Sequence, residues 1–193
     1  MRPMLNETIE RPAAPPAMAA EPLTILVAPN PILRARARPV RPEDAEEVRA
    51  LVPRMFDAMY AAPGIGLAAP QVGVGLRLAV VDLMPNDKPE PIVLVNPQVT
   101  ARSSERAVRE EGCLSLPGQY ADVERPAIVA VEYDDLEGKR RRIEADGLLA
   151  ACLQHEIDHL DGVLFVDHLS ALKRNMIMRR LAKEMRQKRD EAM

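Results

Sequence analysis

The stretch from Cys152 to Gly162 constrains the fold more than any other part of the chain, because it contains the pattern H-E-x-x-H. On an α-helix, residues four positions apart lie on one face, so His155 and His159 would point two imidazole nitrogens at one metal ion. Glu156 would lie within reach of a water molecule bound to that ion. The residues around the motif are apolar nearly all round the helix: Leu148, Leu149, Ala151, Cys152, Leu153, Ile157 and Leu160. Burying two histidines and a glutamate is costly unless they have partners, so we predict a buried metal-binding helix rather than two satisfied core histidines.

The length and composition indicate a chain that can bury a full hydrophobic core. It has 193 residues, of which 47% are hydrophobic, and is most simply one domain. We expect a disordered Pro/Ala-rich leader at residues 1–22 and a single catalytic domain at residues 23–193. No run of about 18 apolar residues is present, so no membrane-spanning helix is expected. The two cysteines, Cys113 and Cys152, are too few for a disulfide framework and fit a reducing compartment.

Charge is unevenly distributed along the chain. The net charge is −3, but residues 170–193 hold eight Lys/Arg against three acids, a net of +5 that leaves −8 for the remainder. A basic helix is expected at residues 171–189, with an apolar stripe formed by Leu172, Met176, Leu181 and Met185. Such a helix could meet a polyanion, or it could simply present a solvated face.

The remaining patterns predict a mixed helix and strand fold. A helix is expected to start at Pro42, and apolar residues recur at helical spacing from Val48 to Tyr60, although Pro53 is expected to interrupt that helix. Short strands are expected at residues 23–27, 76–83, 92–95, 128–133, 140–143 and 163–166, and residues 110–118 are expected to form a loop. The hairpin-like spacing of these strands favours antiparallel or mixed sheet over repeated βαβ units.

A run of small residues extends from Gly64 to Gly73, so another backbone could approach it closely. The run does not match the dinucleotide pattern G-x-G-x-x-G, because position 69 is alanine and no long helix follows. A phosphate-binding loop is therefore excluded. Gln71 is the one side chain in the run that offers both a hydrogen-bond donor and an acceptor.

The identity of the third metal ligand decides the class of enzyme. The metzincin pattern would place a histidine three residues after Gly162, where this chain has Phe165, and His168 comes three residues late. A thermolysin-like site would use a downstream glutamate, but Glu184 lies in the basic helix. Cys113 is the better candidate, because a thiolate in a glycine-containing loop is a strong ligand for zinc or Fe(II). The alternative for Cys113 is a small buried hydrophobe.

Three motifs occur together in a fixed order: G-I-G-L-A-A-P-Q at residues 64–71, E-G-C-L-S at residues 111–115 and H-E-I-D-H at residues 155–159. In this order and spacing the chain resembles the peptide deformylase family from Leu23 to about Arg189. The resemblance implies an α+β fold with antiparallel sheets around the metal helix. It implies Fe2+ as the cofactor, with Zn2+ or Ni2+ as other occupants, and the N-formyl group of the initiator methionine of nascent peptides as the substrate.

The resemblance also implies a role for each motif residue. Cys113, His155 and His159 would bind the metal, and Glu156 would move the proton of the attacking water. Gln71 and the Leu114 backbone N–H would stabilise the oxyanion, and the alternative for Gln71 without the resemblance is an amide that braces a loop. The substrate would contact Gly64, Ile65, Gly66, Leu148, Ala151, Cys152 and Tyr120.

Some residues depart from the family pattern. Tyr120 stands where some members carry arginine, and Arg109 stands where the pocket residue is often apolar. We also hypothesise that Glu111 pairs with Arg125 and so holds the cysteine loop.

By the same resemblance, the basic helix is expected to bind the ribosome, in the cytoplasm of a bacterium rather than in an organelle. Two other classes of protein remain open. One is a metallopeptidase that cuts internal peptide bonds, and the other is a binding protein that has kept the metal but lost the activity.

Overall fold

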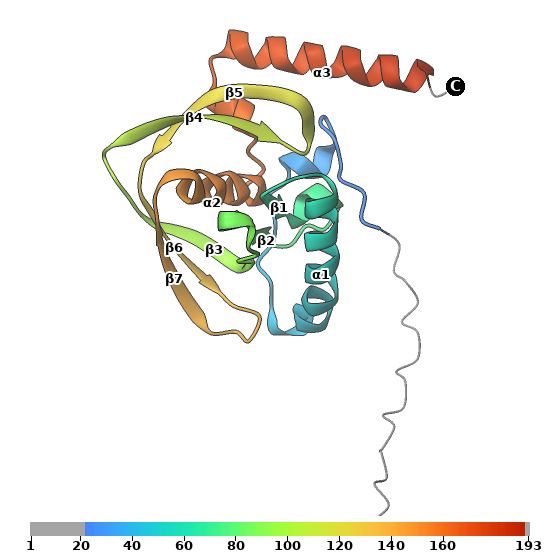
Figure 1. Ribbon diagram of the computed structural model, residues 1–193. Coiled ribbons are helices and arrows are strands. Elements are labelled where there is room, and N and C mark those ends of the chain that lie inside the picture. The colour runs from blue at the N-terminus through green and yellow to red at the C-terminus, as the bar shows by residue number, and fades with distance from the viewer. Residues whose placement is uncertain (1–21, 192–193) are drawn as a thin grey trace, which may run out of the picture.

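A computed structural model describes residues 22–191 and shows a five-stranded antiparallel sheet curved around one buried helix (Figure 1). The strands are β1 (Gly66–Ala68), β2 (Leu78–Val81), β3 (Ile92–Arg102), β6 (Val129–Asp134) and β7 (Arg140–Ala145), in the order β1-β2-β3-β6-β7. A separate hairpin is formed by β4 (Arg106–Cys113) and β5 (Leu116–Pro126). The predicted antiparallel α+β fold is confirmed. The predicted leader lies outside the described residues except for Pro22.

The sheet is covered on both faces near β2, whose four residues are all buried. Successive side chains of a strand point to opposite faces. Leu78 and Val80 accordingly pack in the cluster that contains helix α1 (Ala45–Ala61), while Ala79 and Val81 pack in the cluster that contains helix α2 (Gly147–Leu160). The metal motif is therefore carried on a helix held firmly against the middle of the sheet.

Helix α1 follows the predicted periodicity but does not break at Pro53. The helix runs from Ala45 to Ala61 with Pro53 inside it. Its buried face consists of Val48, Leu51, Val52, Met55 and Met59. Burial of this continuous apolar face outweighs the one backbone hydrogen bond that proline cannot donate.

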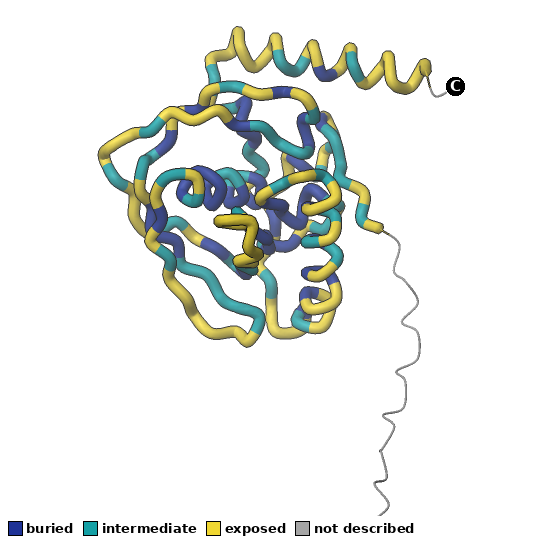
Figure 2. Tube along the Cα trace, viewed as in Figure 1, coloured by how far each residue is buried: buried dark blue, intermediate teal, exposed yellow. Residues whose placement is uncertain are grey.

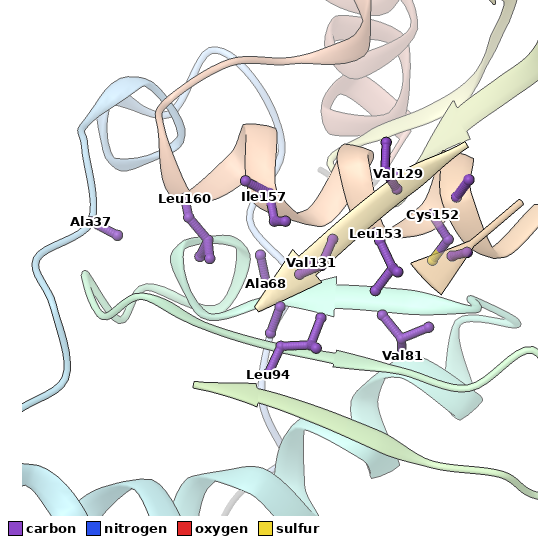
Figure 3. Packing of buried hydrophobic residues seen from close by; sticks show 13 residues of the cluster. Ala37, Ala68, Val81, Leu94, Val129, Val131, Cys152, Leu153, Ile157 and Leu160 are labelled. Carbon is purple, nitrogen blue, oxygen red and sulfur yellow. The ribbon is translucent and has the colours of Figure 1, made fainter. Parts of the chain in front are cut away.

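Helix α2 is buried on most sides, as the apolar residues around the metal motif predicted. Cys152, Leu153, Ile157 and Leu160 pack against the sheet, as Figure 3 shows. The helix begins at Gly147, whose φ of +56° lies in the left-handed region that glycine adopts most easily. This turn lets the chain leave β7 and enter the core directly.

Three local predictions were wrong. Residues 110–118 are not a loop, because β4 and β5 pair through this region and leave only Leu114 and Ser115 as the turn. Residues 23–27 form no strand, since Leu26 and Ala28 donate to the separate carbonyls of Gln71 and Ser115 instead of a ladder. The predicted strand at 163–166 gives way to a 3-10 turn at Phe165–His168, where the Asp167 carboxylate accepts from the Leu164 N–H.

Helix α3 (Ala171–Glu191) lies across the outside of β5 at the top of the view in Figure 1. Its predicted apolar stripe is mostly exposed, as Figure 2 shows for the helix as a whole. Leu181 alone is buried, packing with Leu116 and Phe165, whereas Leu172 and Met176 are 71% and 57% exposed. Across residues 22–191, none of the helices is long and apolar enough to cross a membrane.

Candidate metal and active site

One thiol and two imidazoles converge where the β4–β5 hairpin meets helix α2. Cys113 ends β4, while His155 and His159 lie one turn apart on α2. The ligand atoms of the three residues all lie within 4.8 Å of one another, and Cys113 Sγ is 3.2 Å from His159 Nε2. The structure thus brings together the three residues that the sequence proposed as ligands.

This donor set fits a metal ion. His155 Nδ1 lies 2.9 Å from Glu111 Oε2, which leaves Nε2 free to coordinate. Burial holds the pKa of His159 well below its ordinary value, so that ring stays neutral as a ligand must. One sulfur and two nitrogens also match the borderline-soft ions found in three-ligand catalytic sites.

A buried carboxylate network supports the first histidine from behind. Arg125 donates to both oxygens of Glu111, at 2.6 and 3.0 Å, and to Asp158 at 2.7 Å. Burial alone would raise the pKa of Glu111, but hydrogen bonds to His155 and Arg125 lower it to about 2. Glu111 is therefore a carboxylate that orients His155, and the hypothesised Glu111–Arg125 pair is present. Asp158 also lies 2.7 Å from His168, an extension of the network that sequence spacing alone gave no reason to expect.

Glu156 is only 3% exposed, and its Oε2 has no hydrogen-bond partner among residues 22–191. Burial raises its pKa to about 7, so the group can both accept and release a proton near neutral pH. The side chain lies directly against Gly66 of β1. A Cβ at position 66 would come 2.8 Å from the carboxyl carbon of Glu156 and 3.0 Å from Cys152 Sγ. Glycine is thus the residue that leaves room for the carboxylate.

Gln71 lies on the 3-10 turn Ala69–Val72 that follows β1, and its amide is fixed at both ends. Its Oε1 accepts from the Ala68 N–H at 2.8 Å, which turns the NH2 group toward the cysteine. Nε2 lies 3.2 Å from Ser115 Oγ and 3.6 Å from Cys113 Sγ. The amide both braces the loop and presents donors to the site. Ser115 was missed as a site residue, although it lies inside the E-G-C-L-S motif.

A cavity of about 610 Å³ opens beside this cluster. Apart from His159, every site residue proposed from the sequence lines it: Gly64, Ile65, Gly66, Gln71, Cys113, Leu114, Tyr120, Leu148, Ala151, Cys152, His155 and Glu156. The sequence did not propose Ile25, Val27 and Gln119, which also line it. Ile25 and Val27 were predicted to lie in a strand at residues 23–27, and Gln119 directly follows the predicted loop at residues 110–118.

Strand β1 forms one wall of the cavity and is an edge strand. It pairs with β2 on one side and has no partner strand on the other among residues 22–191. Gly66 of this strand and the preceding Gly64 and Ile65 all line the cavity. An extended peptide could add to this edge through its backbone.

The fold and the site together define a metal-dependent hydrolase with a buried glutamate beside its cluster of ligand atoms. The chain belongs to the polypeptide deformylase family, whose family model matches residues 22–175. As a member of this family it is an enzyme that removes the N-formyl group from nascent polypeptides.

Individual relatives agree with this assignment. The chain is 54% identical over 167 residues to a peptide deformylase of Rhizobium meliloti, covering 86% of this chain and 94% of the relative. A crystal structure of a peptide deformylase from Legionella pneumophila superposes with a TM-score of 0.79 at 50% identity, covering 86% of this chain and 96% of the other. A peptide deformylase from Synechococcus elongatus, solved in complex with actinonin, gives a TM-score of 0.77 at 45% identity, covering 84% and 89% of the two chains. The family and fold predicted from the sequence are therefore confirmed.

Proposed function

We propose that this chain removes the formyl group at the Cys113–His155–His159 centre, with Glu156 as the group that moves the proton. The observation that carries the proposal is the buried carboxylate of Glu156, whose Oε2 has no hydrogen-bond partner in the described part of the chain, beside three converging ligand atoms. A bound ion would supply Lewis acidity, lowering the pKa of a coordinated water and polarising the formyl carbonyl.

The side chains of the site then divide the remaining work. Glu156 accepts the proton of the attacking water and delivers it to the leaving amine. The Gln71 NH2 and the Leu114 backbone N–H donate to the oxygen of the formyl group as negative charge develops there. The peptide lies along the free edge of β1, and the methionine side chain enters the cavity beside Leu148, Ala151 and Cys152.

We propose Fe2+ as the ion, with Zn2+ or Ni2+ as other occupants of the same ligands. The supporting observation is the ligand chemistry, since one sulfur and two imidazole nitrogens suit all three ions. A thiolate bound to Fe(II) is open to oxidation, so the protein is best prepared without oxygen.

The direct test is formate release from formyl-Met-Ala-Ser by protein purified without oxygen. The acetylated tripeptide and a longer unformylated peptide serve as controls. The proposal expects formate from the first substrate and intact controls. Cleavage of internal peptide bonds with the formyl group retained would instead support a metallopeptidase. Buried Phe165, which stacks on His155 at 6.4 Å between ring centroids, stands where a metzincin would need its third histidine.

We also propose that helix α3 docks on the ribosome, in the cytoplasm of a bacterium. The support is the net charge of +5 over residues 170–193, together with the exposure of Arg179, Arg180 and Lys183. Truncation after Ser170 would remove buried Leu181 and so disturb the fold. Replacing the three exposed cations by glutamine is the cleaner test. Co-sedimentation with ribosomes should weaken in the variant and with added salt, and equal binding by variant and parent would contradict the proposal.

A further inference from the structure

Arg109 places one unpaired positive charge at the rim of the substrate cavity. It lies on β4 opposite Val123, and its side chain is exposed. Among the described residues that line the cavity it is the only lysine or arginine, and within residues 22–191 no ion pair joins it to a carboxylate. The other two arginines of this hairpin are both paired, Arg106 with Glu124 and Arg125 with Glu111. The charge of Arg109 is therefore available to a ligand.

The strand geometry fixes where this charge lies relative to the reacting group. Arg109 and Glu111 are two residues apart on β4 and so share one face. Glu111 contacts the ligand His155, which places the backbone of Arg109 about 7 Å further along the strand, away from the metal ligands. Its Nη2 reaches the start of α2, lying 3.6 Å from where a Cβ on Gly147 would be. The guanidinium thus stands beside Leu148, on the methionine side of the cavity.

An extended substrate presents alternate side chains to the same side. If the methionine side chain fills the inner part of the cavity near Ala151 and Cys152, the third residue points the same way and emerges at the rim. The side chain of the second residue points to the opposite face. Arg109 therefore faces the third side chain of the peptide.

We propose that Arg109 is a specificity-determining residue that favours formyl peptides with an acidic side chain at the third position and disfavours basic ones. This inference rests on the proposed function and adds a substrate class to it. The interaction is between exposed charges, so the expected preference is about two- to fivefold in kcat/KM between acidic and neutral side chains. It should decline as salt screens the charge.

Glu110, the neighbour of Arg109 on β4, provides a matched control. It is also exposed and lines the cavity, but it points to the opposite face of the strand and carries the opposite charge. Glutamine at either position removes one charge with little change in size. If only the total charge of the rim mattered, the two substitutions would shift the preference by equal and opposite amounts.

The test measures kcat/KM for formyl-Met-Ala-Glu, formyl-Met-Ala-Gln and formyl-Met-Ala-Lys, all as C-terminal amides, with the parent, Arg109→Gln and Glu110→Gln. The proposal expects the order Glu, Gln, Lys in the parent and in Glu110→Gln, and a flattened order in Arg109→Gln. Equal values in the parent, or an order that persists in Arg109→Gln, would overturn it. Equal and opposite shifts in the two variants would also overturn it. If the parent did not deformylate the glutamine peptide, the proposed function itself would be wrong. That outcome differs from a failure of the Arg109 proposal, in which the peptide is deformylated without the expected preference.

Discussion

The carboxylate of Glu156 occupies the space that a side chain on Gly66 would need. A Cβ at position 66 would lie 2.8 Å from the Glu156 carboxyl carbon, a separation that cannot exist without movement. The glutamate on α2 that we propose moves the proton and the edge of β1 that we propose binds the substrate are thus in direct contact. Gly66 of the G-I-G motif therefore contacts Glu156 of the H-E-x-x-H motif, a contact that neither motif predicts by itself.

Gly66→Ala should therefore damage catalysis more than folding. We expect the free energy of unfolding to fall by about 1–3 kcal/mol from overpacking. Displacement of Glu156 should lower kcat/KM by about 100-fold, as small misplacements of catalytic groups do. Gly75→Ala is the matched control, because nothing lies within 4 Å of a Cβ there. Full activity in Gly66→Ala would show that the carboxylate tolerates a shift and would contradict this view of the contact.

The buried pair between Glu111 and Arg125 should be important for stability. Their side chains are 8% and 6% exposed, so Glu111→Gln leaves the buried Arg125 guanidinium with Asp158 as its remaining carboxylate partner, at a cost of about 3 kcal/mol in the free energy of unfolding. On the same hairpin, Arg106 and Glu124 form an exposed pair, and Glu124→Gln should cost less than about 1 kcal/mol. Chemical denaturation of both variants measures the contrast. Similar losses in the two would refute the structural role given to Glu111.

Much of this fold could be predicted because the sequence contains apolar residues at helical spacing and recognisable motifs. In both α1 and α2 the apolar residues recur at helical spacing, and their burial against the sheet stabilises the two helices. The β4–β5 hairpin was missed because its residues, such as Arg106, Glu110 and Glu124, are charged and outward-facing. Their pairing comes from register with the partner strand, which no local pattern records.

The prediction of a strand at residues 163–166 was wrong for a different reason. A run of four apolar residues cannot distinguish a strand from a buried turn, and the Asp167 cap on the Leu164 N–H selects the turn. In the site, residue type and spacing were enough to propose the three side chains that the fold brings together. The links from Arg125 to Asp158 and from Asp158 to His168 depend on the fold bringing β5, α2 and the following turn together.

The two cysteines should differ completely in metal binding. Cys113 Sγ lies among the ligand atoms, whereas burial raises the pKa of Cys152 well above its ordinary value and keeps it a thiol. Cys113→Ala should therefore lose most of its metal on dialysis, and Cys152→Ala should retain it. Elemental analysis of both proteins gives the answer. Equal metal content would mean that the thiolate of Cys113 is not a ligand.

Acid should remove the contribution of Asp44 to stability. Its carboxylate accepts two hydrogen bonds from Arg38, at 2.7 and 2.8 Å, and one from the Arg41 N–H. These bonds lower its pKa from 3.8 to about 2 in the folded protein. Because the folded pKa is the lower one, the stabilisation is fully present above pH 3.8 and is lost as the pH falls toward 2.

Asp44→Ala should accordingly be less stable than the parent at pH 6, with a gap that narrows below pH 4. Urea unfolding of both proteins across this range measures the gap. A gap that stays constant with pH would show that the charge of Asp44 contributes nothing to folding.

The most direct test of the account is the rate of formate release from formyl-Met-Ala-Ser by Glu156→Gln and by the parent, each prepared without oxygen and matched for bound metal. Glutamine keeps the size of the side chain but cannot take a proton from water. We predict that the variant binds metal as the parent does while kcat falls by about 100- to 10,000-fold. A variant that holds its metal and releases formate at the parent's rate would contradict the role of Glu156.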